Sequence, residues 1–136
     1  MSPHDAAVAW VEAWSEGWAR HDADAIAARY AADCTFRSQP FRPTDRGREA
    51  VREYARAVFE QERSARFAFA APIVGQDGRA AVEYRAVITP LSGPVVTIAG
   101  TSSLRFDDDG FVSEHLETWT EGEGDLGIAI RPEARP

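Results

Sequence analysis

The protein has 136 residues, of which 44% are hydrophobic and 27% are charged, so it fits one globular domain with a single core. Its formal net charge of −7 argues against a general binder of nucleic acids or of anionic membranes. The single cysteine, Cys34, excludes an internal disulfide and a zinc site built on cysteines, and we expect it to be a small buried hydrophobic residue.

The first ten residues, "MSPHDAAVAW", lack the basic region and apolar run of a secretory signal peptide. No stretch approaches the roughly 18 apolar residues that a membrane-spanning helix needs. We therefore expect a cytoplasmic protein with neither nucleic acid nor membrane as a partner.

Two helices are predicted at the start of the chain. Ser2 is a suitable N-cap for the first helix, which runs to about residue 20. It carries apolar residues along one face: Ala7, Trp10, Val11, Trp14 and Trp18. Asp22 is the N-cap of a short second helix over residues 23–31, which would bury Tyr30.

A third helix and five strands follow from the patterns in the rest of the chain. The helix is predicted from about residue 46 to residue 62, with its apolar face formed by Val51, Tyr54, Val58 and Phe59. The strands are predicted over residues 33–38, 66–75, 79–90, 95–106 and 111–120. The turn "DDDG" before the last strand lacks the alternating ligands of a calcium loop, so we expect an ordinary hairpin turn.

The predicted order is helix, helix, strand, helix and then four antiparallel strands. It indicates an α+β fold in which the helices pack against one face of a curved sheet. We expect residues 1–121 to form a single domain and residues 122–136 to form a loose C-terminal tail, in which "GIAI" (127–130) is a candidate short edge strand.

Three stretches carry a resemblance to a known family. "AWSEGWARHDADAIAARYAADCTFRS" (13–38) and "RGREAVREYARAVF" (46–59) resemble the first half of the nuclear-transport-factor-2-like superfamily, in its SnoaL-like branch. "FDDDGFVSEHLETWT" (106–120) resembles the last hairpin of that branch. The resemblance implies a cone-shaped domain with one deep, mainly apolar pocket, no cofactor, and a homodimer formed through the outer face of the sheet.

The ketosteroid isomerases are relatives of this branch, and all three of their functional positions are occupied by other residue types here. Their general base, an aspartate at the end of the first strand, falls on Ser38 or, with a slip of one residue, on Gln39. Their oxyanion-binding tyrosine falls on Trp14, and their protonated aspartic acid falls on Ser102. Serine and glutamine do not abstract protons near neutral pH, and tryptophan offers only an N–H donor. The resemblance thus argues against steroid isomerisation by that mechanism.

The last predicted strand carries the candidate catalytic pair. Alternate residues share one face of a strand, here Phe111, Ser113, His115, Glu117 and Trp119. His115 and Glu117 lie about 7 Å apart at Cα, so they can touch each other or one bound molecule. Such a pair suits enolisation, dehydration or an aldol-type cyclisation. An ordinary His–Glu contact at a solvated strand end is the alternative, and the resemblance favours the pocket.

Eight residues are expected to bind the ligand. Three would form apolar walls: Trp14, Phe36 and Trp119. Three would donate hydrogen bonds to a substrate oxygen: Gln39, Tyr84 and Ser102. The other two are Ser38 and Tyr54, although Tyr54 also suits the core. We expect Trp18 in the core, and His4 and His21 in solvent.

The sequence predicts binding of a small, largely hydrophobic organic molecule. Cofactor-free acid/base catalysis of the isomerase, cyclase or dehydratase type is the catalytic hypothesis. The alternative is a non-catalytic ligand-binding or dimerisation module, because the carboxylates of the relatives are missing. The chain contains no GxGxxG, P-loop, HExxH or Ser–His–Asp spacing, so we expect no metal and no cofactor.

Overall fold

The structure of the protein, a computed structural model, describes residues 1–131. Over these residues the chain forms α1 (Pro3–Ala19), α2 (Ala23–Ala27), β1 (Tyr30–Arg37), β2 (Asp45–Arg46), α3 (Arg48–Gln61), β3 (Glu62–Phe69), β4 (Ile73–Val74), β5 (Arg79–Pro90), β6 (Val96–Phe106) and β7 (Val112–Glu123). Apart from the two-residue strands β2 and β4, these elements follow the predicted order. The α+β fold class is therefore confirmed.

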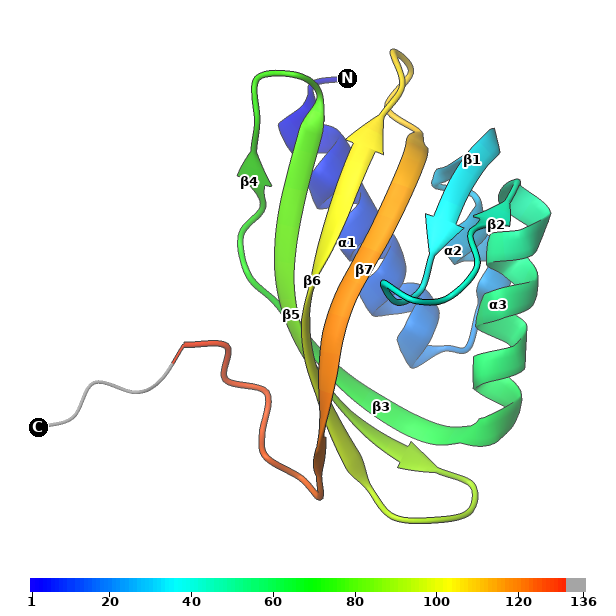
Figure 1. Ribbon diagram of the computed structural model, residues 1–136, viewed down its shortest axis with the longest axis vertical. Coiled ribbons are helices and arrows are strands. Elements are labelled where there is room, and N and C mark those ends of the chain that lie inside the picture. Colours follow the sequence, from blue (N-terminus) through cyan, green and yellow to red (C-terminus); the bar gives the residue numbers. More distant parts are fainter. Residues whose placement is uncertain (132–136) are drawn as a thin grey trace, which may run out of the picture.

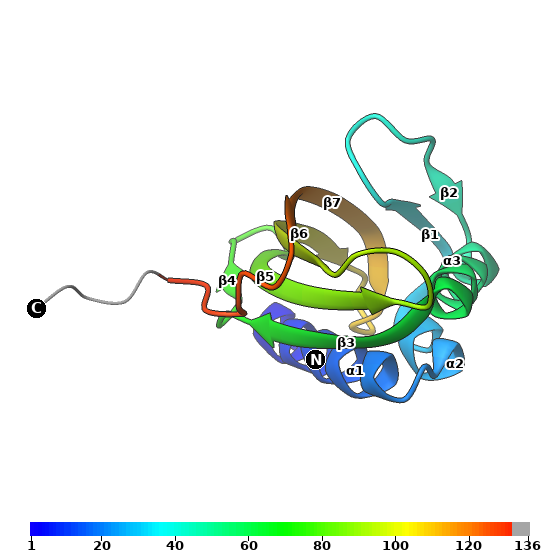
Figure 2. The ribbon, with the colours of Figure 1, turned by 90° about the horizontal axis from the view of Figure 1, so that it is seen from below.

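The strands form one mixed sheet in the order β2-β1-β7-β6-β5-β3, and β4 pairs with β5. β1 runs parallel to β7, and the other neighbours are antiparallel. Figures 1 and 2 show that the sheet curves strongly, with α1 beside β3 and with α2 and α3 packed together near β1. This arrangement confirms the predicted cone-shaped fold of helices on a curved, mostly antiparallel sheet.

Both N-terminal helices begin at their predicted caps. The Ser2 hydroxyl accepts the backbone N–H of Asp5 at 3.1 Å, and the Asp22 carboxylate accepts that of Ala25 at 3.0 Å. The apolar stripe of α1 is buried as predicted, and it includes Ala7, Trp10, Trp14 and Trp18. The three indoles carry large apolar surfaces into the space against the sheet.

The predicted second helix is too long, and the placement of Tyr30 in it is wrong. α2 ends at Ala27, and Tyr30 is the first residue of β1, opposite Val112 of β7. The Tyr30 side chain is fully buried. The helical preference of the alanine-rich segment is overridden here because pairing with β7 satisfies the backbone and buries the ring.

The strand predicted over residues 66–75 is in fact two strands. β3 starts earlier, at Glu62, and ends at Phe69, while β4 lies beyond Pro72. Proline has no N–H to donate to a ladder, which interrupts the strand.

The predicted face of the last strand is also only partly correct. The register between β6 and β7 shifts after the pair Arg105–Glu114, so β7 contains a bulge at Ser113. Val112 consequently takes the buried position before His115, and Phe111 and Ser113 do not continue its face. From His115 onwards the alternation holds, since His115 and Glu117 are both buried.

β7 runs to Glu123, into the predicted tail. Residues 127–130, the candidate edge strand, form no strand, and residues 132–136 lie outside the described part of the chain. Cys34 is fully buried, as predicted. No helix within residues 1–131 is long and apolar enough to cross a membrane.

Candidate active site

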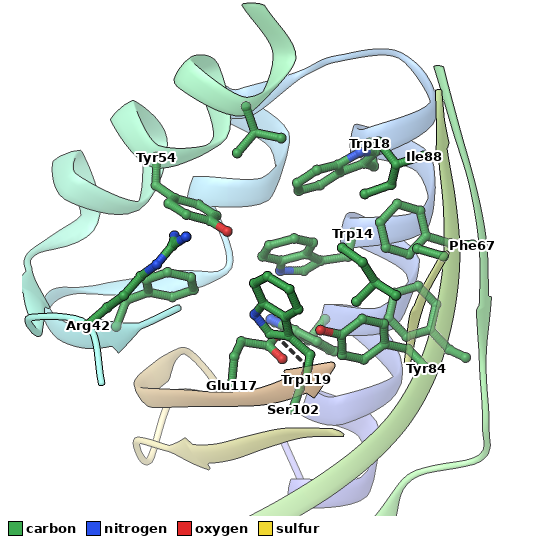
Figure 3. A pocket seen from close by; sticks show the side chains of 16 residues that line it. Trp14, Trp18, Arg42, Tyr54, Phe67, Tyr84, Ile88, Ser102, Glu117 and Trp119 are labelled. Carbon is green, nitrogen blue, oxygen red and sulfur yellow. Dashed lines mark hydrogen bonds between the residues drawn. The ribbon is translucent and has the colours of Figure 1, made fainter. Parts of the chain in front are cut away.

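A cavity of about 230 Å³ lies between the helices and the inner face of the sheet. Its walls are mainly aromatic, formed by Trp10, Trp14, Trp18, Phe36, Tyr54, Phe67, Phe69, Tyr84 and Trp119. Arg42, Ser102 and Glu117 also line it. Figure 3 shows the hydroxyls of Tyr54 and Tyr84 turned towards the cavity from opposite sides.

Pairing between β6 and β7 positions the carboxylate of Glu117. Ser102 is the direct partner of Glu117 in the ladder, and its hydroxyl donates to Glu117 Oε1 at 2.7 Å (Figure 3). Two positions away, Gly100 is opposite Trp119. A Cβ at Gly100 would lie 2.6 Å from the Trp119 Cβ and 2.5 Å from the Thr118 carbonyl oxygen, so only glycine permits this close approach.

A chain of buried hydrogen bonds continues behind Glu117. Its Oε1 is also 2.7 Å from Nε2 of His115. The other ring nitrogen, His115 Nδ1, is 2.7 Å from the Tyr30 hydroxyl. That hydroxyl accepts the indole N–H of Trp10 at 3.0 Å and the indole N–H of Trp14 at 3.1 Å. The chain therefore links α1, β1 and β7 to one oxygen of Glu117.

The chemistry of the donors fixes where the protons lie. An indole N–H can only donate, so Trp10 and Trp14 occupy both lone pairs of the Tyr30 oxygen. Tyr30 must then donate its own proton to Nδ1 of His115. The imidazole is neutral in this arrangement, and it donates its Nε2 proton to Glu117. Burial raises the pKa of Tyr30 well above its ordinary value, although the two indole bonds oppose the shift, and the hydroxyl stays protonated.

The two oxygens of Glu117 are used unequally. Oε1 accepts from both Ser102 and His115, whereas Oε2 is buried and has no hydrogen-bond partner within residues 1–131. The residue is only 8% exposed and lines the cavity. A buried carboxylate oxygen without a donor is energetically costly in an empty site. A ligand that brings a proton or a donor would relieve that cost.

Two tyrosine hydroxyls complete the polar groups of the cavity. Burial, followed by the charge of Glu117, raises the pKa of Tyr84. Burial and the charge of Glu117 also raise the pKa of Tyr54, while the charge of Arg42 lowers it. Both tyrosines therefore remain neutral O–H donors across the physiological pH range.

The structure brings most of the predicted site residues together at this cavity. Seven of them line it: Trp14, Phe36, Tyr54, Tyr84, Ser102, Glu117 and Trp119. His115 is fully buried behind Glu117, so the carboxylate is the member of the pair that faces the cavity. Trp18, predicted as a core residue, is both buried and part of the wall.

Two predicted ligand-binding residues, Ser38 and Gln39, support the loop beside the cavity instead of lining the described wall. The Ser38 carbonyl accepts the indole N–H of Trp119 at 2.6 Å, and its hydroxyl accepts from Arg42 at 3.3 Å. The Gln39 carbonyl accepts the backbone N–H of Arg42 at 3.1 Å. Their contacts fix the positions of Trp119 and Arg42, which do face the cavity.

Sequence reasoning missed the part that Tyr30 and Trp10 play. A buried indole needs a hydrogen-bond acceptor, so the tryptophan row on α1 was a signal that an acceptor lies opposite. The sequence did not identify that acceptor, because Tyr30 belongs to another element, 20 residues from Trp10 and 16 from Trp14. Its second partner, His115, is 85 residues away. Within residues 1–131, no three histidine, cysteine, aspartate or glutamate side chains gather as a metal site would require.

A second buried carboxylate corrects the expectation that His21 is solvent-exposed. Glu62 is 4% exposed, and both its oxygens accept the indole N–H of Trp18, at 3.1 and 2.9 Å. Nε2 of His21 is 2.9 Å from Glu62 Oε2, and the imidazole stacks on Phe59. His21 is consequently half-buried, because α3 and β3 bring Glu62 and Phe59 against the end of α1. His4 is exposed, as predicted.

The amino-acid sequence matches a known protein family over most of its length. Residues 11–115 match the SnoaL-like domain. The chain belongs to the SnoaL-like domain family. The match runs from within α1 to His115 in β7, so it covers the resembling stretches 13–38 and 46–59 and the first part of 106–120. This SnoaL-like protein has no match among curated proteins.

Solved structures share the fold of the SnoaL-like protein at low sequence identity. The epoxide hydrolase/cyclase-like enzyme SalBIII, described in pyran ring formation in the polyether salinomycin, has a TM-score of 0.73 and 20% identity, covering 84% of this chain and 92% of its own. An NTF2-like protein of unknown function from Exiguobacterium sp. 255-15 has a TM-score of 0.72 and 14% identity, and the alignment covers 85% of this chain and 98% of that protein. An M. tuberculosis LEH-like epoxide hydrolase has a TM-score of 0.70 and 14% identity, and the alignment covers 86% of this chain and 84% of that protein.

Proposed function

We propose that this SnoaL-like protein is an enzyme that binds a small, largely apolar organic molecule and moves a proton on it with the carboxylate of Glu117. The observation that carries the proposal is the free Oε2 of Glu117, buried in an aromatic cavity while Oε1 is held by two donors. The descriptions of two structural neighbours, a cyclase-like enzyme of pyran ring formation and an epoxide hydrolase, support small-molecule chemistry on this fold.

The proposed step is proton abstraction from a carbon beside a carbonyl group. Oε2 takes the proton, the C–H electron pair forms a C=C bond, and the carbonyl oxygen becomes an enolate oxygen. A neutral tyrosine hydroxyl, that of Tyr84 or of Tyr54, donates a hydrogen bond to that oxygen as its charge develops. Return of the proton from Glu117 to another carbon of a conjugated enolate gives an isomer. Attack of the enolate carbon on an internal carbonyl group gives a ring: the C=O π bond breaks, and the new alkoxide oxygen takes the proton from Glu117.

His115 and Ser102 act in this proposal as positioning residues. Both donate to Oε1, so the rotation of the carboxylate is fixed and Oε2 remains directed into the cavity. The neutral imidazole is itself held by Tyr30 from the other side. Such a supported carboxylate loses little orientational freedom when the substrate binds.

The test is enzyme-dependent exchange of carbon-bound hydrogen in D₂O, followed by ¹H NMR over a panel of small cyclic ketones and β-dicarbonyl compounds. Glu117→Gln should reduce the exchange rate by about 10²- to 10⁴-fold, the usual contribution of a positioned base. Glu62→Gln is the matched control, since it alters a second buried carboxylate outside the aromatic cavity and should change the rate by less than about fivefold.

Equal rates for Glu117→Gln and the unmodified protein would contradict the proposal. Saturable binding of panel compounds with no exchange and no product would instead indicate the non-catalytic ligand-binding module.

A further inference from the structure

The cavity has two charged side chains in its described wall, one of each sign. Glu117 lies on β7 in the interior, with its carboxylate against Ser102. Arg42 belongs to the loop between β1 and β2. Among residues 1–131, it is the one basic residue that lines the cavity. Figure 3 shows its guanidinium beside the ring of Tyr54, on the side of the cavity away from Tyr84. A ligand therefore meets a carboxylate inside and a cation near the loop.

Arg42 has no carboxylate partner among residues 1–131. Its side chain donates to the Ser38 hydroxyl at 3.3 Å, a neutral partner. Several other arginines of the described chain do form ion pairs with carboxylates, among them Arg52, Arg56, Arg66 and Arg79. In a protein with a net charge of −7, a guanidinium that faces a cavity without an acidic partner is available to an anion from outside.

Arg42 also lies where two hollows meet. A second hollow of about 420 Å³ lies between α3 and the end of β5, and its wall includes Ala57, Pro90 and Glu62, whose carboxylate is hydrogen-bonded to Trp18 and His21. Arg42 and Tyr54 line both hollows. Arg42 itself is exposed, so an anionic group bound there keeps part of its hydration while the rest of the molecule enters the aromatic cavity.

We propose that the substrate is an organic anion, an apolar body ending in a carboxylate or a similar group, and that Arg42 binds the anionic end and so orients the molecule. This inference rests on the proposed function, because it names the substrate class of the same site. The opposite orientation would place two negative charges together at Glu117, which is strongly unfavourable in a buried site. The anionic end thus stays at Arg42 and an uncharged carbon meets Oε2.

The position of Tyr54 supports this direction. Its hydroxyl faces the cavity, and its pKa responds to both charges, raised by Glu117 and lowered by Arg42, with burial the largest cause of the net rise. Tyr54 therefore lies within electrostatic reach of both ends. A neutral donor between them can bind an oxygen of the substrate next to the reacting carbon.

The experiment compares two probes that differ mainly in charge, 2-naphthoate and 2-naphthamide. Their Kd values are measured by titration calorimetry, with quenching of tryptophan fluorescence to show binding beside the indoles of the cavity. Arg42→Gln should raise the Kd of 2-naphthoate by about tenfold, the lower end of what a charge-assisted hydrogen bond contributes to binding. The Kd of 2-naphthamide should change by less than about twofold.

Arg105→Gln is the matched control, because Arg105 is exposed on β6, lines neither hollow, and carries the same charge. It should leave both Kd values unchanged, which separates a local contact from a change in overall net charge. Glu117→Gln should lower the Kd of 2-naphthoate relative to that of 2-naphthamide, since it removes the negative charge that repels the carboxylate.

Three results would overturn the inference: an equal effect of Arg42→Gln on both probes, an equal effect of Arg42→Gln and Arg105→Gln on 2-naphthoate, or no saturable binding of either probe. The first two leave the proposed proton transfer intact if Glu117→Gln still abolishes hydrogen exchange. Failure of the anion inference is thereby distinguishable from failure of the proposed function.

Discussion

Two histidine–glutamate pairs within residues 1–131 have a buried carboxylate, and they are built differently. In the pair His21–Glu62, both carboxylate oxygens accept the indole N–H of Trp18, and Oε2 is also next to the imidazole. The His21 side chain is 32% exposed. In the pair His115–Glu117, the histidine is fully buried, and one carboxylate oxygen carries both hydrogen bonds while the other carries none.

The difference shows which pair is suited to chemistry. Both oxygens of Glu62 already accept hydrogen bonds, which tie the end of α1 to the start of β3. Glu117 has one oxygen fixed and one free, and the free oxygen faces an aromatic cavity. The residue types are the same in both pairs, and both carboxylates are buried. The pairs differ in how the donors are distributed: both oxygens of Glu62 accept hydrogen bonds, whereas one oxygen of Glu117 accepts none within residues 1–131.

The largest expected effect on stability comes from removing the buried histidine. His115→Ala leaves the Tyr30 hydroxyl and Glu117 Oε1 each without a partner and creates a cavity. It should lower the free energy of unfolding by about 3–5 kcal/mol. His21→Ala should cost about 1 kcal/mol, because water can reach the vacated position and Trp18 still donates to Glu62. Urea denaturation followed by circular dichroism measures both, and equal losses would remove the distinction between the pairs.

The next effect concerns the support of His115. Tyr30→Phe leaves two buried indole N–H groups without an acceptor and His115 Nδ1 without a donor, so it should cost about 2–3 kcal/mol. The control is Tyr54→Phe, whose hydroxyl faces the cavity and should cost less than about 0.5 kcal/mol.

The ring of His115 also tests the proton positions assigned along the chain of hydrogen bonds. ¹⁵N chemical shifts of the intact protein at neutral pH should report the neutral Nε2–H tautomer for His115. Detection of the Nδ1–H tautomer, or of a charged ring, would show that the proton order along the chain is wrong.

A smaller effect is expected from Ser102→Ala. The change removes one of the two donors to Glu117 Oε1 and should cost about 1 kcal/mol of stability. Hydrogen exchange on a substrate should fall by about tenfold, because the carboxylate can then rotate. Ser103→Ala, at the neighbouring exposed position of β6, should change neither quantity. An unchanged exchange rate in Ser102→Ala would show that His115 alone suffices to orient Glu117.

The smallest expected effect concerns the ionisation of the tyrosines, which leaves the free energy of unfolding unchanged at neutral pH. Burial raises the pKa values of Tyr30, Tyr54 and Tyr84 above the ordinary value near 10. Above that pH the unfolded chain loses tyrosine protons that the folded chain retains, so the free energy of unfolding should fall as the pH rises. Absorbance at 295 nm should stay constant from pH 8 to pH 10 and then rise together with unfolding. Tyrosinate formation in the folded protein below pH 10 would contradict the burial of these hydroxyls.

Local patterns predicted much of this molecule. The caps at Ser2 and Asp22, the tryptophan stripe of α1 and the alternation in β5 and β6 were sufficient for the fold class, because each depends on residues close together in the chain. The spacing of His115 and Glu117 also predicted that they share one strand face. The segment around Tyr30 was the exception, since its alanines favour a helix and only pairing with β7 makes it a strand.

The sequence alone therefore determined most of the elements, their order and the strand face that His115 and Glu117 share. Tertiary structure alone decided which member of that pair faces the cavity, because the answer depends on Tyr30, Trp10 and Trp14 approaching His115 from other elements. It likewise decided that both oxygens of Glu62 are hydrogen-bonded and that Arg42 lines the aromatic cavity. Periodicity assigns a side chain to a face, whereas the curvature of the sheet and the packing of α1 decide which groups meet there.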